Sequence, residues 1–308
     1  MFKEFTYPSA NGQDHICAWA YIPFDKPKGI VQFLHGVGDH SRRYMHTIYR
    51  LLDAGYAVYA ADALGHGKTG VDGGNLGFPR THDYMDYIKD EKALHDIAAA
   101  DYPGLPYFML GHSWGTIKIR TYATLFGEDL AGFILSGIVA RMEGLDIESD
   151  DPDFEAAAKA DPHASAGEWG GKVFLNMCRR IPDPQTPNDF ASLDHGNVLD
   201  YIADPFCGLD GSMWLYFDGV TQMYKYVMHP DWASKVPSNI PVLNIFGDED
   251  PAGGFGLGGY AVSNMLADNG NPVTTRAYSK YRHDLLTDRG IRDQMIDEII
   301  AFLDAITA

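Results

Sequence analysis

A serine lies between two glycines in the stretch Gly111-His112-Ser113-Trp114-Gly115. The stretch follows an apolar run, residues 107–110, that is short enough for a buried strand, and it precedes a segment that is typical of a helix. A serine at such a strand-to-helix turn adopts a strained backbone conformation, and the flanking glycines leave room for it. The pattern therefore predicts that Ser113 is a nucleophile.

A serine hydroxyl needs a base to take its proton, and that base must be oriented by a third group. His283 lies five residues beyond an expected strand at 273–278, and Asp250 follows an expected strand at 241–246. Both residues thus leave the carboxyl ends of strands, where open α/β sheets place their sites. The chain order of serine, acid and histidine also fits a nucleophile at a strand-to-helix turn.

The choice of acid is between neighbouring carboxylates, because Asp248, Glu249 and Asp250 are consecutive. We favour Asp250, which lies directly before Pro251, where the strand has ended and the chain turns. Asp248 is the alternative, and its other possible role is to accept hydrogen bonds from backbone amides of the turn. The acid would hold the tautomer of His283 and stabilise the imidazolium.

A glycine-rich loop, His35-Gly36-Val37-Gly38, follows the apolar run at 29–34. Such a loop lets backbone N–H groups approach a reacting carbonyl. We expect the amides of Val37 and Trp114 to form the oxyanion hole, and His35 and Gly36 to contact substrate. The alternative for His35 and Gly36 is a tight turn without a further role.

These motifs together resemble the monoacylglycerol lipase and lysophospholipase branch of the α/β-hydrolases, of the serine aminopeptidase S33 type. Residues 35–44 are similar to its HG-x-G-E-H-S-x-R-Y signature, and residues 62–69 to its D-x-R-G-H-G-x-S loop. Residues 247–251 resemble its G-x-x-D acid segment, which supports Asp250, and residues 281–284 resemble its R-H-E turn. The resemblance implies an α/β-hydrolase fold with an inserted helical cap.

The sequence departs from that family pattern at three positions. Leu64 replaces an arginine, Thr116 stands after the nucleophile turn where glycine is common, and Asp284 replaces a glutamate. None of these three positions has an expected catalytic role, but they leave the substrate open.

Length and composition fit one large domain with an insertion, because 308 residues with 45% hydrophobic content can bury a sizeable core. Expected strands and helices alternate, which favours a mostly parallel sheet covered on both faces. The strands are expected at 16–23, 29–35, 56–61, 107–112, 132–136, 241–246 and 273–278, and the helices at 41–54, 81–100, 114–126, 260–268 and 289–306. We assign 1–140 and 232–308 to the core.

Residues 141–231 interrupt the alternation and are rich in aromatic residues and methionine, so we expect a cap over the site. Met213, Phe217 and Tyr224 fall on one helical stripe together with Val220 and Val227. We expect the first three to bind substrate by lining an apolar acyl pocket. The alternative is that the stripe packs the cap onto the core.

The net charge of −18, from 24 basic and 42 acidic residues, disfavours nucleic acid and anionic membranes as partners. No run approaches the ~20 apolar residues of a membrane span, and the first residues lack an apolar signal segment. Three cysteines without paired spacing favour a reducing cytoplasm. The acidic residues of 146–161 are expected to be solvated, and no histidine spacing indicates a metal, so we expect neither metal nor cofactor.

The predicted function is therefore a serine carboxylester hydrolase that acts through an acyl-enzyme. Its expected substrates are small molecules, namely monoacylglycerol, lysophospholipid or other medium-sized esters. Two alternatives remain, an aminopeptidase or amidase on the same fold and a non-catalytic binding relative. The oligomeric state is left open.

Overall fold

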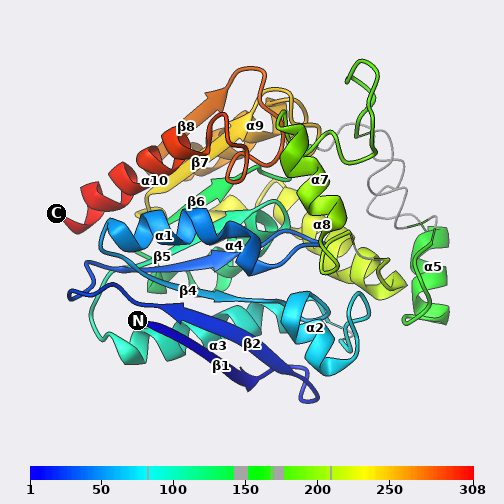
Figure 1. Ribbon diagram of the computed structural model, residues 1–308, viewed down its shortest axis with the longest axis horizontal. Coiled ribbons are helices and arrows are strands. Elements are labelled where there is room, and N and C mark those ends of the chain that lie inside the picture. Colours follow the sequence, from blue (N-terminus) through cyan, green and yellow to red (C-terminus); the bar gives the residue numbers. More distant parts are fainter. Residues whose placement is uncertain (82, 142–151, 168, 170–176, 209) are drawn as a thin grey trace.

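The computed structural model describes residues 1–81, 83–141, 152–167, 169, 177–208 and 210–308. A central sheet runs through it in the strand order β1-β2-β4-β3-β5-β6-β7-β8 (Figure 1). The strands are β1 (Phe2–Pro8), β2 (His15–Tyr21), β3 (Ile30–Leu34), β4 (Ala57–Ala61), β5 (Tyr107–His112), β6 (Gly132–Ser136), β7 (Val242–Gly247) and β8 (Val273–Tyr278). The β1–β2 and β2–β4 pairs are antiparallel, and the other pairs are parallel. The mostly parallel sheet of an α/β-hydrolase is thus confirmed.

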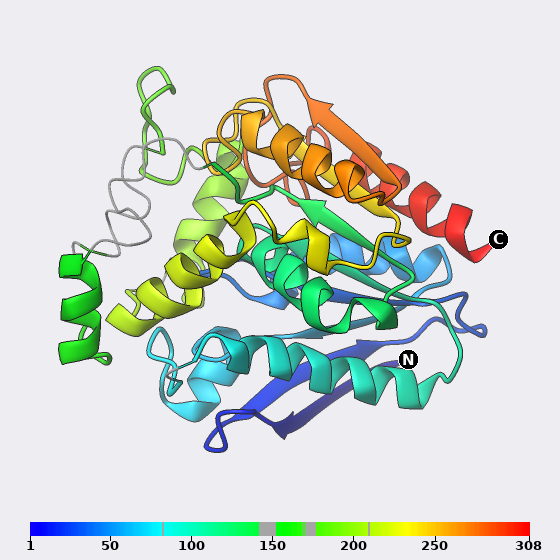
Figure 2. The same ribbon diagram turned by 180° about the vertical axis from the view of Figure 1, so that it is seen from behind.

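Helices cover both faces of this sheet. The α-helices of the described residues are α1 (Met45–Asp53), α2 (Gly67–Gly73), α3 (Met85–Asp101), α4 (Trp114–Phe126), α5 (Pro152–Ala160), α7 (His195–Ala203), α8 (Met223–Met228), α9 (Leu257–Asp268) and α10 (Arg292–Thr307). Five of them, α1, α3, α4, α9 and α10, pack on the sheet faces. Apolar residues of α1 and α10 share one buried cluster with the sheet, and those of α3, α4 and α9 share another on the opposite face, which Figure 2 presents. Within the described residues, no helix has the length and apolar character needed to cross a bilayer.

Two elements were not expected from the sequence. Strand β1 is an edge strand whose side chains are mostly exposed, so it lacks the alternation of buried and exposed residues that indicates a strand. Helix α2 contains Gly67, Gly70 and Gly73, and glycine is a poor helix former. Gly70 is nevertheless required, because a Cβ there would lie 2.9 Å from the backbone of Gly65.

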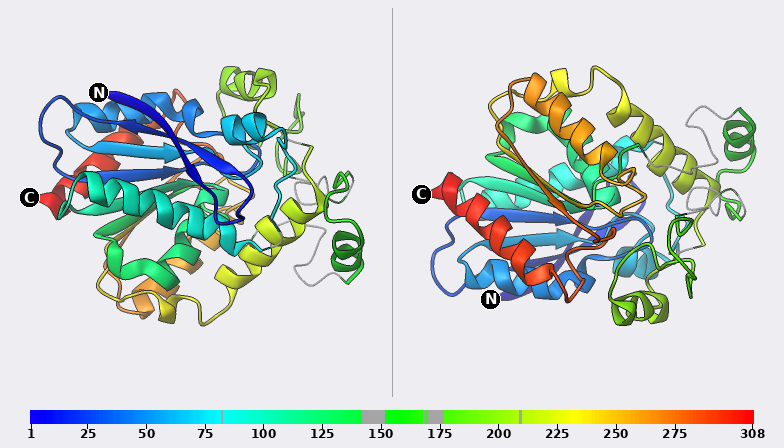
Figure 3. Two further views of the ribbon diagram at one scale, coloured as in Figure 1. Left: turned by 90° about the horizontal axis from the view of Figure 1, so that it is seen from below. Right: turned by 90° about the horizontal axis from the view of Figure 1, so that it is seen from above.

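The chain between β6 and β7 contributes α5, α7, a π-helical segment (Leu215–Gln222) and α8. These helices lie together beyond one end of the sheet, on the side away from the two termini, in both views of Figure 3. Assigning 141–231 to a cap remains a prediction. Two of the acidic residues that were expected to be solvated, Asp153 and Asp161, are exposed. Four further acidic residues of that group lie outside the described residues, namely Asp146, Glu148, Asp150 and Asp151.

Candidate active site

Ser113 lies at the sharp turn between β5 and α4, with φ of 54° and ψ of −119°. This positive φ is unfavourable for a residue with a side chain, so the packing around it must hold the turn in place. Gly111 and Gly115 allow this packing because they carry no side chain. A Cβ at Gly115 would lie 2.2 Å from the carbonyl oxygen of Leu34, and a Cβ at Gly111 would lie 2.7 Å from the backbone of Gly115. The turn can therefore form only because both positions are glycine.

The structure brings His283 and Asp250 together from loops that follow β8 and β7. The Nδ1 atom of His283 lies 2.9 Å from Oδ2 of Asp250, which is fully buried. The other carboxylate oxygen of Asp250 accepts a hydrogen bond from the amide of Ala252 at 2.8 Å. Asp250 is thus fixed in orientation, and its contact with Nδ1 leaves Nε2 of His283 to act on another group.

The alternative acid, Asp248, lies elsewhere. Its carboxylate accepts a hydrogen bond from the amide of Lys280 at 2.6 Å, which links the loop after β7 to the loop after β8. This contact is the turn-stabilising role that the sequence allowed for Asp248. Of the two aspartates, it is Asp250 that hydrogen-bonds to His283.

The loop after β3 lies directly against Ser113. A Cβ at Gly36 would lie 3.2 Å from Cβ and 3.6 Å from Oγ of Ser113, so the loop backbone approaches the hydroxyl closely. Trp114 is the first residue of α4, where a backbone N–H has no partner within its own helix. Gly36, Val37, Ser113, Trp114 and His283 all line one cavity. The predicted oxyanion donors, Val37 and Trp114, therefore flank the predicted nucleophile.

His35 is not among the residues that line this cavity, and its contact with substrate stays a prediction. Its side chain is fully buried, and its Nε2 accepts a hydrogen bond from the amide of Ala63 at 3.0 Å. Since Nε2 accepts, the ring proton is on Nδ1, which lies 2.7 Å from the carbonyl oxygen of Gly36. Burial lowers the pKa of His35 well below its usual value, which keeps the ring neutral. His35 thus holds the loop in place.

The cavity has a volume of about 690 Å³, within the usual range for small-molecule sites. The segment between β6 and β7 supplies much of its apolar wall, including Met177, Phe190, Val198, Tyr216 and Val220. The same segment also holds the histidine loop, because the amide of His283 donates to the carbonyl of Phe190 at 3.3 Å.

The stripe residues Met213, Phe217 and Tyr224 do not line the cavity, contrary to expectation. Residues Leu215–Gln222 form a π-helix, whose i→i+5 hydrogen bonds take more residues per turn than an α-helix, so an α-helical stripe does not keep to one face there. Phe217 instead packs edge-to-face on Phe154 of α5, with ring centroids 5.4 Å apart. The sequence therefore predicted an apolar wall, and of the five stripe residues Val220 lines the cavity.

Comparison with known proteins agrees with this geometry. Residues 25–290 match the family described as serine aminopeptidase, S33. The chain belongs to this family. A highly thermostable carboxyl esterase from Bacillus coagulans, solved in complex with glycerol, is similar over the whole fold. Its TM-score is 0.95 and its sequence identity 39%, with 100% of this chain and 99% of that chain covered.

Two curated relatives are similar over part of the chain. The monoacylglycerol lipase of Mycolicibacterium smegmatis is 32% identical over 174 residues, which are 48% of this chain and 60% of that protein. The human monoglyceride lipase is 35% identical over 128 residues, which are 41% of this chain and 40% of that protein. Each match spans less than two thirds of the relative's own length.

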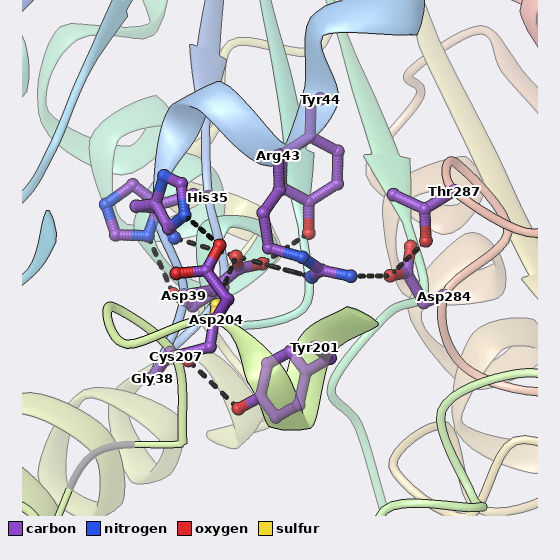
Figure 4. Close-up of polar contacts among 12 residues, drawn as sticks. His35, Gly38, Asp39, Arg43, Tyr44, Tyr201, Asp204, Cys207, Asp284 and Thr287 are labelled. Atoms are coloured by element: carbon purple, nitrogen blue, oxygen red, sulfur yellow. Dashed lines mark hydrogen bonds and ion pairs between the residues drawn. The ribbon is translucent and has the colours of Figure 1, made fainter. Parts of the chain in front are cut away.

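Three charged residues, Asp39, Arg43 and Asp284, line the cavity of this S33-family protein and form a charged wall. Figure 4 shows their side chains together. The Arg43 guanidinium lies between two buried carboxylates, 3.4 Å from Asp39 and 3.7 Å from Asp284. Tyr44 donates a hydrogen bond to Asp39, and Thr287 donates one to Asp284, both at 2.5 Å. Asp39, Arg43 and Asp284 occur within the motifs quoted above, but nothing in their spacing showed that they meet at the site.

The charges of this wall act on His283. Burial is the largest single effect and disfavours the charged imidazolium, but the carboxylates of Asp250, Asp284 and Asp39 together outweigh it. The net result is that the pKa of His283 is raised above 6.5. As a general base His283 must be neutral, so activity is expected to fall as the pH drops through this raised pKa.

Replacing Asp284 by Asn is expected to shift the acid limb of the pH–rate profile to lower pH. Removal of a nearby negative charge lowers the pKa of His283, so its neutral form persists into more acidic solution. The measurement is kcat/KM against pH for Asp284→Asn and for the wild type. Asp293→Asn, on the exposed part of α10, is the matched control and should leave the acid limb in place. An acid limb that moves upward in Asp284→Asn would contradict the assignment.

Proposed function

We propose that this protein is a serine carboxylester hydrolase that works through an acyl-enzyme on Ser113. The observation that carries the proposal is the buried hydrogen bond between Asp250 and His283, whose ring lines the same cavity as Ser113. A serine at a strained turn, a histidine base and a carboxylate that orients it are the parts that nucleophilic catalysis by serine requires.

Each residue has a defined role in this mechanism. Ser113 Oγ attacks the ester carbonyl while His283 Nε2 takes its proton, and Asp250 stabilises the imidazolium. The amides of Val37 and Trp114 donate hydrogen bonds to the developing oxyanion, and Gly36 leaves the space that lets this loop approach. His283 then gives its proton to the departing alcohol, and a water molecule activated by the same histidine releases the acid.

The cavity supports a medium-sized ester with an apolar acyl chain and a polar alcohol. Its lining includes the apolar side chains of Met177, Phe190 and Val220 and the charged side chains of Arg43 and Asp39. Esters of the monoacylglycerol or lysophospholipid type likewise combine an apolar acyl chain with a polar alcohol part in one molecule. The names of the relatives, a carboxyl esterase, a monoacylglycerol lipase and a monoglyceride lipase, support this substrate class.

An aminopeptidase would need carboxylates free to hold the substrate ammonium. Asp39 and Asp284 line the cavity, but both lie against Arg43, which offsets part of their charge. Neutral esters therefore suit this site better than a cationic amine.

The experiment that tests the proposal compares hydrolysis rates across three kinds of substrate. We expect turnover of p-nitrophenyl esters from two to twelve acyl carbons and of a monoacylglycerol, with an aminoacyl anilide cleaved far more slowly. Faster cleavage of the anilide than of every ester would move the function to an aminopeptidase.

Val220→Ala is expected to change the preferred acyl-chain length, because Val220 lines the cavity. A methylene in an apolar site is worth on the order of 1 kcal/mol, so the preference should change several-fold per carbon. Phe217→Ala is the matched control from the same helix, and it should lower the melting temperature without moving the optimum. The pocket assignment fails if the optimum moves in Phe217→Ala and not in Val220→Ala.

We also infer that the protein works in a reducing compartment such as the cytoplasm. The support is that Cys17, Cys178 and Cys207 are all free thiols. Its partners in this proposal are small-molecule esters.

A further inference from the structure

Three side chains with metal-ligand chemistry meet beside the active-site cavity, outside the proposed catalytic machinery. His40 lies on the loop after β3, and Asp204 and Cys207 follow α7. One ligand atom from each residue lies within 4.8 Å of the other two, and Nε2 of His40 is 2.9 Å from Oδ2 of Asp204. Figure 4 shows Asp204 and Cys207 close to the charged wall of the cavity.

We propose that His40, Asp204 and Cys207 form a binding site for one thiophilic divalent cation of the Zn²⁺ class. A nitrogen, a carboxylate oxygen and a thiolate are the ligand types that Zn²⁺ takes in proteins, and three protein ligands leave a fourth tetrahedral position for water. The residues were not found from the sequence because His40 and Asp204 are 164 positions apart. The expectation of no metal rested on local spacing alone.

The charges around the cluster favour a cation. Three carboxylates, Asp39, Asp204 and Asp284, surround one guanidinium, that of Arg43. Asp39 also lies close to the thiol, with its Oδ1 atom 3.8 Å from Sγ of Cys207. A thiolate and the Asp204 carboxylate together neutralise the two charges of the ion.

The protons balance on binding. The Cys207 thiol gives up its proton to solvent when it binds the ion, because the thiolate is the form that ligates a metal. Without the ion, Nε2 of His40 carries a proton and donates it to the Asp204 carboxylate. Binding therefore requires Nε2 to lose this proton to solvent, so that Nδ1 carries the proton of the ring and the lone pair of Nε2 binds the ion. Asp204 exchanges its hydrogen bond with His40 for a bond to the metal.

The two segments that carry the ligands are already held together. The amide of Gly208 and the hydroxyl of Tyr201 both donate hydrogen bonds to the carbonyl of Gly38, each at 2.9 Å. Asp204 is itself oriented, since its Oδ1 accepts from the amide of Phe206 at 2.9 Å. A bound ion would therefore join the loop that carries Val37 to the segment after α7 with little rearrangement, and it should raise the melting temperature.

The test titrates Zn²⁺ alone into the full chain after treatment with a chelator and its removal. Calorimetry should give one site per chain, and Co²⁺ used in its place should produce the near-ultraviolet band of a cobalt–thiolate bond. Cys207→Ser should abolish that band and weaken binding by more than about 100-fold, because even groups that only support metal ligands are worth about 10- to 100-fold. Cys178→Ser, which alters another partly exposed thiol, is the matched control and should bind as the wild type does.

Absence of Zn²⁺ binding by the wild type, or equal binding by the wild type and Cys207→Ser, would overturn the proposal. Asp204→Asn gives a second check on the same ligand set, and its fold is compared with the wild type by circular dichroism. Ser113→Ala should bind Zn²⁺ normally, so the metal site and the proposed esterase function can fail independently.

Discussion

Ser113→Ala is expected to leave a folded protein whose kcat for ester hydrolysis is lower by roughly 10⁴- to 10⁶-fold, as for the loss of a nucleophile in related chemistry. The fold should persist because Ser113 is half-buried at the cavity wall and alanine suits the same backbone turn no worse than serine does. The measurements are steady-state rates on a p-nitrophenyl ester and a thermal unfolding curve for each protein.

A fluorophosphonate probe provides an independent check on the same residue. It should label the wild type with one equivalent and leave Ser113→Ala unlabelled. Thr116→Ala, one turn into α4 and buried, is the control and should still be labelled. Labelling that persists in Ser113→Ala would assign the nucleophile to another residue.

Asp250→Asn is expected to lower kcat by roughly 10⁴-fold, whereas Asp248→Asn should cost far less. Asn cannot stabilise the imidazolium with a charge, and its amide can donate to Nδ1 and so select the wrong tautomer of His283. The carboxylate of Asp248 accepts its hydrogen bond from the amide of Lys280, which stabilises the turn and does not involve His283. The comparison requires kcat for both variants on one ester at one pH.

The opposite ranking would transfer the role of the acid to Asp248. Equal and small losses would mean that neither carboxylate orients His283. In both cases the melting temperature of each variant shows whether the loss comes from the chemistry or from a displaced loop.

The nucleophile turn and the His–Asp pair could be predicted because local sequence determines them. The glycines around Ser113 are required by close contacts with Leu34 and within the turn itself. His283 and Asp250 each follow a buried or edge strand, and parallel strands bring their carboxyl ends to one edge of the sheet. The spacing along the chain was therefore enough to place these residues at one site.

The cavity-lining residues between β6 and β7 could not be predicted in the same way, because the sequence analysis assumed the period of an α-helix for this stripe. The π-helix at Leu215–Gln222 changes that period, and the carbonyl of Gly219 within it accepts a hydrogen bond from Nε1 of Trp114 at 2.7 Å. No local pattern marks such a contact between residues 105 positions apart.

The role of His35 also depends on a distant partner. The Ala63 amide that donates to its ring lies on the loop after β4, so the sequence near His35 could not distinguish a loop anchor from a substrate contact. The charged wall has the same origin, since Arg43 meets Asp284 only when the first and last parts of the chain fold together.

The most direct test of an acyl-enzyme on Ser113 is mass spectrometry of the protein quenched in acid during turnover of a p-nitrophenyl ester. We predict a mass increase equal to one acyl group, located on the peptide that contains Ser113 and absent from Ser113→Ala. Steady turnover with no acyl adduct, or with the adduct on a different residue, would contradict the account.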